Sequence, residues 1–149
     1  MQDKIYYLMS IKPKYAYRIF TGIKKFELRK WFGIVPEEGS IVVVYASGSV
    51  KAIIGEFRVG RVIRGTPSEV WRFLELETET GVGREDYSYI HGSKNAMAIE
   101  VIEPRLYSKP ITLSELRSIL PGFMPPLSFR RLHPLEPLYE LIIRKARTL

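Results

Sequence analysis

The sequence predicts an α+β fold, a small mixed β-barrel of five or six strands with short flanking helices. Three observations support this prediction: the strand-like runs are short, glycines interrupt the longest of them, and two capping boxes start helices between strands. The elements do not alternate as regularly as a parallel doubly wound sheet requires. Since 149 residues with 46% hydrophobic content suffice for one packed core, we expect a single domain over residues 1–149.

The pattern of residues 5–29 predicts a strand, a helix and a second strand in immediate succession. Residues 5–11 form a compact apolar run with two tyrosines, which is typical of a strand buried on both faces. Pro13 suits the first turn of a helix, and Gly22 suits its end. Apolar and charged residues alternate over residues 26–29, so the two charged side chains there should share one face of a strand.

The middle of the chain predicts two further strands and a helix. Residues 40–46 are rich in β-branched side chains and end at a Ser-Gly-Ser break. Residues 51–63 are too long and too rich in glycine for a flat strand, so we expect a bulge or a sharp bend at Gly55 or Gly60. The capping box at residues 66–69, with proline at its first helical position, starts a helix.

The last part of the chain predicts a strand, a short helix and an ordered C-terminal segment. Residues 95–103 alternate as a strand does, and a second capping box opens a helix at Thr112. Residues 121–137 are dense in proline but keep two phenylalanines, which favours an extended wrap over a disordered linker. With a final helix from about Leu138, residues 104–149 should form a C-terminal wrap and helix that pack on the barrel.

The formal charge of +7 is concentrated at the two ends of the chain. It sums to +6 over residues 1–30, −4 over residues 31–103 and +5 over residues 104–149. If the two ends meet in the fold, their charges form one basic surface suited to phosphate groups. The alternative is an ordinary charged surface with chance clustering.

Several classes of site are excluded by residues that the sequence lacks. It contains no cysteine, which excludes disulfides, thiolate nucleophiles and cysteine metal sites. The two histidines, His91 and His133, are far apart and have no ligand motif around them, so we expect neither a metal nor a cofactor. The chain has neither an apolar signal core at its start nor a run of about 18 apolar residues, which predicts a cytoplasmic protein without membrane contact.

Residues 10–30 hold the most informative pattern in the chain. A basic turn with Lys12 and Lys14 precedes the predicted helix, and the motif Gly-x-Lys-x-x-Glu-x-Arg follows it at residues 22–29. One carboxylate, that of Glu27, is bracketed by Lys12, Lys14, Lys24, Lys25, Arg29 and Lys30. This arrangement predicts a site for a polyanion or a nucleotide.

The charged residues of the motif have a chemical interpretation and a plainer structural one. Lys24 follows a glycine turn, from which its ammonium group can reach a phosphate, or it is a solvated lysine. Arg29 offers a planar fork to a phosphate or to the Glu27 carboxylate. Glu27 either orients the arginine, accepts a hydrogen bond from a base, or acts as a general base.

Aromatic and hydroxyl side chains flank these charges. Tyr15, Trp31 and Phe32 are suited to stacking on unpaired bases, although most aromatic residues at such spacing belong to a core. Ser47, in the break after a predicted strand, can hydrogen-bond a phosphate or simply serve the turn.

These residues resemble the ASCH domains, small β-barrels related to the PUA domains of RNA-modifying enzymes. Residues 10–15 are similar to that family's first strand and its turn into a helix, and residues 22–29 are similar to its G-x-K-x-x-E-x-R signature. Residues 54–57 and 96–99 resemble later strands of the family, and residues 126–130 resemble the tail of an archaeal-type subgroup. The resemblance implies a PUA-like barrel whose cleft, between the basic turn and the signature, binds RNA or a nucleotide.

The resemblance also implies two hydrolytic activities. Some relatives remove the acetyl group from N4-acetylcytidine with the signature lysine, a threonine three residues later and a glutamate beyond the motif. Lys24 matches the lysine, but Glu27 stands where that subgroup has threonine, and Glu85, Glu100 and Glu103 are candidates for the remaining carboxylate. Other relatives are ribonucleases.

The sequence therefore predicts a module that binds RNA or a nucleotide in a basic cleft, in RNA metabolism or translation-linked regulation, with DNA as a second candidate partner. The expected binding residues are Lys12, Lys14, Tyr15, Lys24, Arg29 and Ser47. The alternative is a metal-independent hydrolase, either a ribonuclease or an N4-acetylcytidine-type amidohydrolase, with Lys24 and Glu27 as its catalytic residues. A third class is a protein-interaction module that uses the proline-rich tail.

Overall fold

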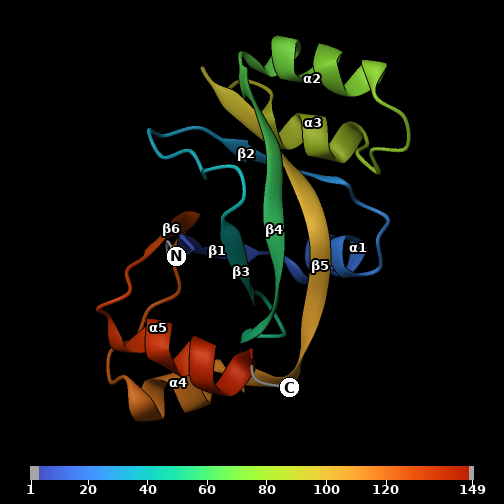
Figure 1. Cartoon of the computed structure of the whole chain (residues 1–149). Helices are drawn as coiled ribbons and strands as arrows, with labels where there is room; N and C mark the ends of the chain where they lie inside the picture. Colours follow the sequence, from blue (N-terminus) through green and yellow to red (C-terminus); the bar gives the residue numbers. More distant parts are fainter. Residues whose placement is uncertain (1–3, 148–149) are drawn as a thin grey trace.

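Six strands within residues 4–147, the part of the chain that the computed structural model describes, form one mixed sheet that curls into a half-barrel (Figure 1). The strands are β1 (Tyr6–Ile11), β2 (Phe26–Lys30), β3 (Ile41–Ala46), β4 (Ala52–Gly65), β5 (Ala96–Thr112) and β6 (Phe129–Leu132). The helices are α1 (Pro13–Phe20), α2 (Pro67–Leu76), α3 (Arg84–Ile90), α4 (Leu113–Ile119) and α5 (Pro137–Leu141), and α5 continues into the π-helical turn η1 (Ile142–Ala146). The predicted α+β class and strand number are confirmed.

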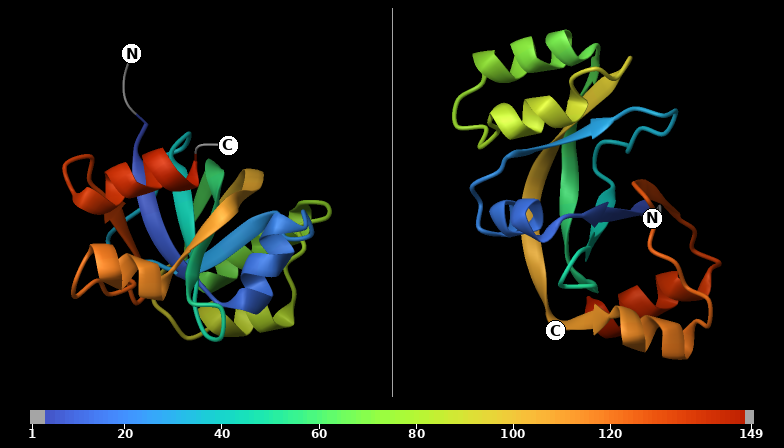
Figure 2. Two further views of the ribbon diagram at one scale, coloured as in Figure 1. Left: turned by 90° about the horizontal axis from the view of Figure 1, so that it is seen from below. Right: turned by 180° about the vertical axis from the view of Figure 1, so that it is seen from behind.

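The strand order is β2-β5-β4-β3-β1-β6, in which β1 and β3 pair in parallel and the other described neighbours are antiparallel. The long β4–β5 ribbon runs through the molecule, with α2 and α3 at one of its ends and α4 and α5 at the other (Figures 1 and 2). Among the described helices, none is long and apolar enough to cross a membrane.

The side chains of β1 and β3 divide between two apolar clusters because successive residues of a strand face opposite ways. Leu8 and its partner Val43 join the cluster that includes residues of α4, α5 and η1. Met9 and its partner Val44 join the cluster into which α1 packs. The first strand is therefore buried on both faces, as the sequence predicts.

A third cluster anchors β2, the strand that carries the Glu-x-Arg part of the signature motif. Phe26 and Leu28 face α2 and α3 and pack with Val70, Leu74 and Ile90. The helices α2 and α3 cover the side of β2 that carries Phe26 and Leu28. The opposite side of the strand, which carries Glu27 and Arg29, therefore faces into the curl of the sheet.

The predicted irregularity in β4 is confirmed at both glycines. The pairing register between β4 and β5 shifts at Gly55 and again around Gly60. A Cβ atom at Gly60 would lie 2.5 Å from the Glu100 carboxylate, which fills the bulge and accepts a hydrogen bond of 3.0 Å from the backbone N–H of Arg61. The Arg61 guanidinium also contacts this carboxylate at 2.8 Å, so the bulge is held by one ion pair.

Two elements differ from the sequence prediction. The strand expected to end at residue 103 continues to Thr112 as β5, and Pro104 is accommodated because it lies at a register shift, where a missing backbone N–H does no harm. The bounds of helix α3 were not predicted, because its seven residues are too few for a helical apolar pattern. The proline-rich segment is ordered, as predicted, and contains the short strand β6.

Replacing Glu100 by glutamine should make stability less dependent on acid pH. Hydrogen bonds from Arg61 lower the pKa of the Glu100 carboxyl, so its contribution is present above about pH 4.3, the pKa of an unfolded glutamate, and lost as the pH falls through the folded value. Urea unfolding should show Glu100→Gln less stable by about 1 kcal/mol at neutral pH, with the difference shrinking below about pH 4.3. A constant difference across this range would contradict the assignment.

Candidate functional site

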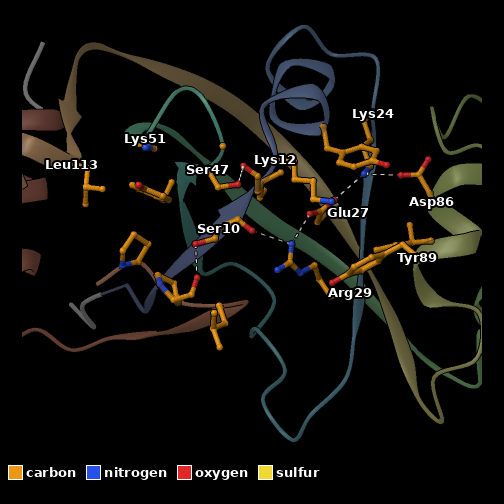
Figure 3. A pocket seen from close by; sticks show the side chains of 18 residues that line it. Ser10, Lys12, Lys24, Glu27, Arg29, Ser47, Lys51, Asp86, Tyr89 and Leu113 are labelled. Carbon is orange, nitrogen blue, oxygen red and sulfur yellow. Dashed lines mark hydrogen bonds and ion pairs between the residues drawn. The ribbon is translucent and has the colours of Figure 1, made fainter. Parts of the chain in front are cut away.

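A pocket of about 620 Å³ lies where the ends of β1 and β3, the start of α1, β2, α3 and the proline-rich segment meet (Figure 3). Its lining residues are Ser10, Ile11, Lys12, Tyr15, Lys24, Glu27, Leu28, Arg29, Tyr45, Ser47, Gly48, Lys51, Asp86, Tyr89, Leu113, Pro125, Pro126 and Leu127. A volume of this size is within the usual range for small-molecule sites.

Four buried charged side chains form one connected cluster on the pocket wall, which we call the charge cluster: Lys24, Glu27, Arg29 and Asp86. The Lys24 ammonium lies 2.8 Å from one oxygen of Glu27 and 2.9 Å from Asp86. The Arg29 guanidinium lies 3.1 Å from the other oxygen of Glu27. Two cations thus alternate with two carboxylates, and the cluster has no net charge.

Backbone contacts place Lys24 in this cluster. The turn after α1 passes through Gly22 at a positive φ of 81°, and the backbone N–H of Lys24 donates to the carbonyl of Arg18 at 2.9 Å. On the other side, Gly81 lies so close that a Cβ atom there would be 2.0 Å from the Ile23 carbonyl oxygen. The turn is therefore held between the end of α1 and the loop that precedes α3.

Glu27 and Arg29 share one face of β2, as the alternation of residues 26–29 predicts. Their ion pair is direct evidence of this arrangement. Both side chains are nearly fully buried, whereas the sequence left open whether they form a structural ion pair or act on a ligand.

Asp86 belongs to α3 and was missed by the sequence analysis. One carboxylate oxygen accepts from the backbone N–H of Gly83 at 2.9 Å at the start of α3, and the other accepts from Lys24. Only the Asp86 half of a capping box is present, because Gly83 has no side chain. The acidic residue three positions after a glycine is thus a weak signal for the start of the helix, and it does not indicate that the carboxylate meets Lys24.

Arg29 joins parts of the sheet that are far apart in strand order. It donates to the carbonyl oxygen of Ser10 in β1 at 3.2 Å and to the hydroxyl of Ser128, just before β6, at 3.0 Å. Ser10 in turn donates to the carbonyl of Pro126 at 2.6 Å. These contacts hold the proline-rich segment as one wall of the pocket (Figure 3).

The Lys24 ammonium is protonated at neutral pH. Burial lowers its pKa, but the attraction and hydrogen bonds of Glu27 and Asp86 outweigh burial and raise the pKa above its usual value. Its contribution to stability is therefore present below about pH 10.4 and lost as the pH rises through the folded value. The ammonium also lies 4.6 Å from the centre of the Tyr15 ring, a cation–π contact.

The exposed rim of the pocket carries Lys12 and Lys51, neither of which has a carboxylate partner among the described residues. Ser47 also lines the pocket. Lys14 does not: it pairs with Glu85 at 2.8 Å and lines a separate, mostly apolar groove beside α1. The structure thus brings together every expected binding residue except Lys14.

The basic C-terminal part of the chain does not supply cations to this pocket. The lining residues from residues 104–149 are apolar: Leu113, Pro125, Pro126 and Leu127. Four cations and two carboxylates line the pocket in all, so its excess charge of +2 comes from the rim lysines.

None of the three glutamates considered for a second carboxylate lines the pocket. Glu85 pairs with Lys14 and with Arg18, while Glu100 and Glu103 pair with arginines of β4. The second carboxylate in the pocket is instead that of Asp86, the residue after Glu85. Within residues 4–147, no group of three or more His, Asp or Glu side chains is arranged to hold a metal ion.

A family model for the ASCH domain matches residues 9–109 of this chain. The chain belongs to the ASCH domain family. The match includes the basic turn, the signature motif and Asp86, and it ends before residues 126–130, so the archaeal-type subgroup is not supported.

Several relatives are similar to this ASCH domain over most of its length. A Zymomonas mobilis protein named ASCH domain-containing ribonuclease is 26% identical over 122 residues, which cover 81% of this chain and 80% of that protein. The crystal structure of ASCH from Zymomonas mobilis has a TM-score of 0.77 at 25% identity and covers 93% of this chain and 95% of that one. The N-terminal domain of McrB from Staphylothermus marinus shares the fold, with a TM-score of 0.60 at 16% identity, and covers 97% of this chain and 99% of that one.

Removing Lys24 should destabilise the ASCH domain strongly, because Lys24→Met leaves the Asp86 carboxylate buried without its cation. We expect a loss of about 3–5 kcal/mol in the free energy of unfolding, measured with urea at neutral pH. The matched control, Lys12→Met on the exposed rim, should change stability by less than about 0.5 kcal/mol. Equal effects of the two substitutions would show that the charge cluster does not support the fold.

Proposed function

We propose that this ASCH domain binds RNA, or a nucleotide, with an unpaired nucleotide entering the pocket between Lys12 and Lys51. The observation that carries the proposal is the distribution of charge: a neutral, buried cluster lies below a rim of two exposed lysines without carboxylate partners among the described residues. A ligand with a negatively charged backbone and a neutral polar end matches this distribution.

The rim lysines are suited to phosphate groups. The ammonium groups of Lys12 and Lys51 are exposed, and no carboxylate of the described residues competes for them. Lys24 and Arg29 are already neutralised by Glu27 and Asp86, so in this binding mode they add little attraction for a phosphate. Sequence-independent attraction of the backbone therefore arises mainly at the rim.

The charge cluster is suited to the hydrogen-bonding edge of a base. Each oxygen of Glu27 accepts from one cation, which leaves a second lone pair on each, and two of the three Lys24 N–H donors are used by carboxylates. The side chains of Lys24 and Glu27 are only 3% and 4% exposed, so a base in a duplex cannot reach them. The proposal therefore specifies single-stranded RNA, consistent with the way proteins read RNA sequence.

Removing the two rim charges should weaken RNA binding without changing the fold. Fluorescence anisotropy with labelled single-stranded RNA should show Lys12→Gln/Lys51→Gln binding about tenfold more weakly at low salt. The slope of log affinity against log salt should fall by about 1.4, because each lost phosphate contact on a single strand removes about 0.7.

The matched control is Lys14→Gln/Lys109→Gln, which removes two exposed lysines that do not line the pocket. It should bind RNA as the unmodified domain does. If both double variants lose the same affinity, the binding is diffuse electrostatic attraction and the pocket is not the site. In a separate comparison with the unmodified domain, duplex RNA of the same length should bind more weakly than the single strand.

A ribonuclease activity is the second candidate, and its support is the 26% identical relative named as a ribonuclease over four fifths of the chain. Metal-independent cleavage needs a base for the 2′-hydroxyl proton, cations for the charge that develops on phosphorus, and an acid for the leaving 5′-oxygen. In this mode the scissile phosphate, and not the base, contacts the charge cluster.

The charge cluster contains one group for each of these roles. Glu27 would take the 2′-hydroxyl proton as the 2′-oxygen attacks phosphorus, and Arg29 would stabilise the negative charge. Lys24, protonated at neutral pH, would give its proton to the 5′-oxygen as the bond between phosphorus and that oxygen breaks. The products are a 2′,3′-cyclic phosphate and a 5′-hydroxyl end.

Replacing Glu27 by glutamine should abolish cleavage if this activity exists. We expect a fall in the cleavage rate of about 100-fold or more, measured on gels with end-labelled RNA. Because Glu27→Gln leaves the buried cations Lys24 and Arg29 with one carboxylate, the variant should also be less stable. Cleavage and affinity are therefore measured at a temperature at which circular dichroism shows the variant folded, and anisotropy should then show nearly unchanged affinity. The control Glu85→Gln changes an exposed carboxylate outside the pocket and should leave cleavage intact. Binding by the unmodified domain with the RNA left whole would reject the ribonuclease and keep the binding function.

A further inference from the structure

Aromatic and cationic side chains continue beyond the pocket where β2 ends. The Lys30 ammonium lies 5.3 Å from the centre of the ring of Tyr89, a residue that lines the pocket. The guanidinium of Arg64, in β4, lies 5.3 Å from the ring centre of Trp31. Phe32 follows and is 79% exposed.

Strand pairing places Arg64 and Trp31 next to the charge cluster. Arg29 in β2 pairs with Met97 in β5, and Met97 pairs with Arg64 in β4. Residues directly opposite one another point to the same face of a sheet, so Arg64 shares the face of Arg29, as Trp31 does by alternation. Lys30 points to the other face of this edge strand by the same alternation, and its ammonium group reaches the edge of the pocket at the ring of Tyr89. With two strand spacings between them, the Cα atoms of Arg29 and Arg64 are about 10 Å apart.

The two cations of this group are available to a ligand. Neither Lys30 nor Arg64 has a carboxylate partner among the described residues, whereas the arginines Arg58, Arg61 and Arg130 each pair with a glutamate. Arg64 is exposed, and its planar guanidinium covers Trp31. Exposed aromatic rings beside free cations are the features that bind single-stranded nucleic acid without a sequence requirement.

We propose that Lys30, Trp31, Phe32, Arg64 and Tyr89 form a second RNA subsite, the flanking subsite, which binds the nucleotides adjacent to the one in the pocket. This inference rests on the proposed RNA-binding function. Phe32 and Tyr89 stack on unpaired bases, and Lys30 and Arg64 contact the phosphates between them. The domain then binds a short single-stranded segment and not only an isolated nucleotide.

The test compares a hexanucleotide of mixed sequence with a mononucleotide of the same base. For the unmodified domain, the hexanucleotide should bind at least about tenfold more tightly, since each additional base stacked on an aromatic ring adds affinity. Phe32→Ala/Arg64→Ala should weaken hexanucleotide binding at least about fivefold and leave mononucleotide binding unchanged. Its salt slope for the hexanucleotide should also fall by about 0.7, for one lost phosphate contact.

The matched control is Leu135→Ala/Arg131→Ala, which removes one exposed apolar side chain and one exposed arginine outside the pocket and the flanking subsite. It should leave the binding of both ligands unchanged. If Phe32→Ala/Arg64→Ala binds the hexanucleotide normally while Lys12→Gln/Lys51→Gln does not, the flanking subsite is refuted and the pocket function stands. If the unmodified domain binds neither ligand, the proposed function itself fails.

Fluorescence provides a measurement that does not depend on affinity. The chain has two tryptophans, so Trp71→Phe leaves Trp31, under Arg64, as the single reporter. Its emission should change when the hexanucleotide binds and stay constant when the mononucleotide binds. An unchanged emission at saturating hexanucleotide would overturn the flanking subsite.

Discussion

The guanidinium group of Arg29 is the point on which the pocket depends. It contacts Glu27 on its own strand, the carbonyl of Ser10 in β1 and the hydroxyl of Ser128 before β6. The strands β2 and β6 are the two edges of the sheet in strand order, so a single side chain links segments that the backbone ladder leaves apart. A planar group with five donors is suited to this task, and a lysine is not.

The cost of burying Arg29 explains the rest of the cluster. A buried guanidinium needs a carboxylate, and Glu27 provides it, but Lys24 then requires Asp86 because two cations would otherwise share one anion. Neutrality of the cluster thus stabilises the fold. Its consequence for ligand chemistry is that the attraction for phosphate in the proposed binding mode comes from side chains outside the cluster.

Local patterns in the sequence predict the strands, the capped helices and the shared face of Glu27 and Arg29, because each depends on residues close together in the chain. The position of Asp86 depends on packing of α3 against β2, with Phe26 and Leu28 in one apolar cluster with Ile90, and no local pattern contains that information.

Whether the two basic ends of the chain form one basic surface also depends on tertiary structure. The strands β1 and β6 do pair, but the C-terminal residues that reach the pocket are apolar. Lys14 and Lys12 look equivalent in sequence, yet the turn of the helix directs one to Glu85 and the other to the pocket rim.

The contact between Gly81 and the carbonyl of Ile23 restricts how this family member can diverge. The loop between α2 and α3 has to pass close over the Lys24 turn, and α3 starts three residues after Gly81. An insertion or deletion between residues 77 and 83 would therefore shift Asp86 relative to Lys24 even though the loop is on the surface. The length of this loop is therefore constrained by the ion pair between Lys24 and Asp86, although no residue of the loop takes part in that pair.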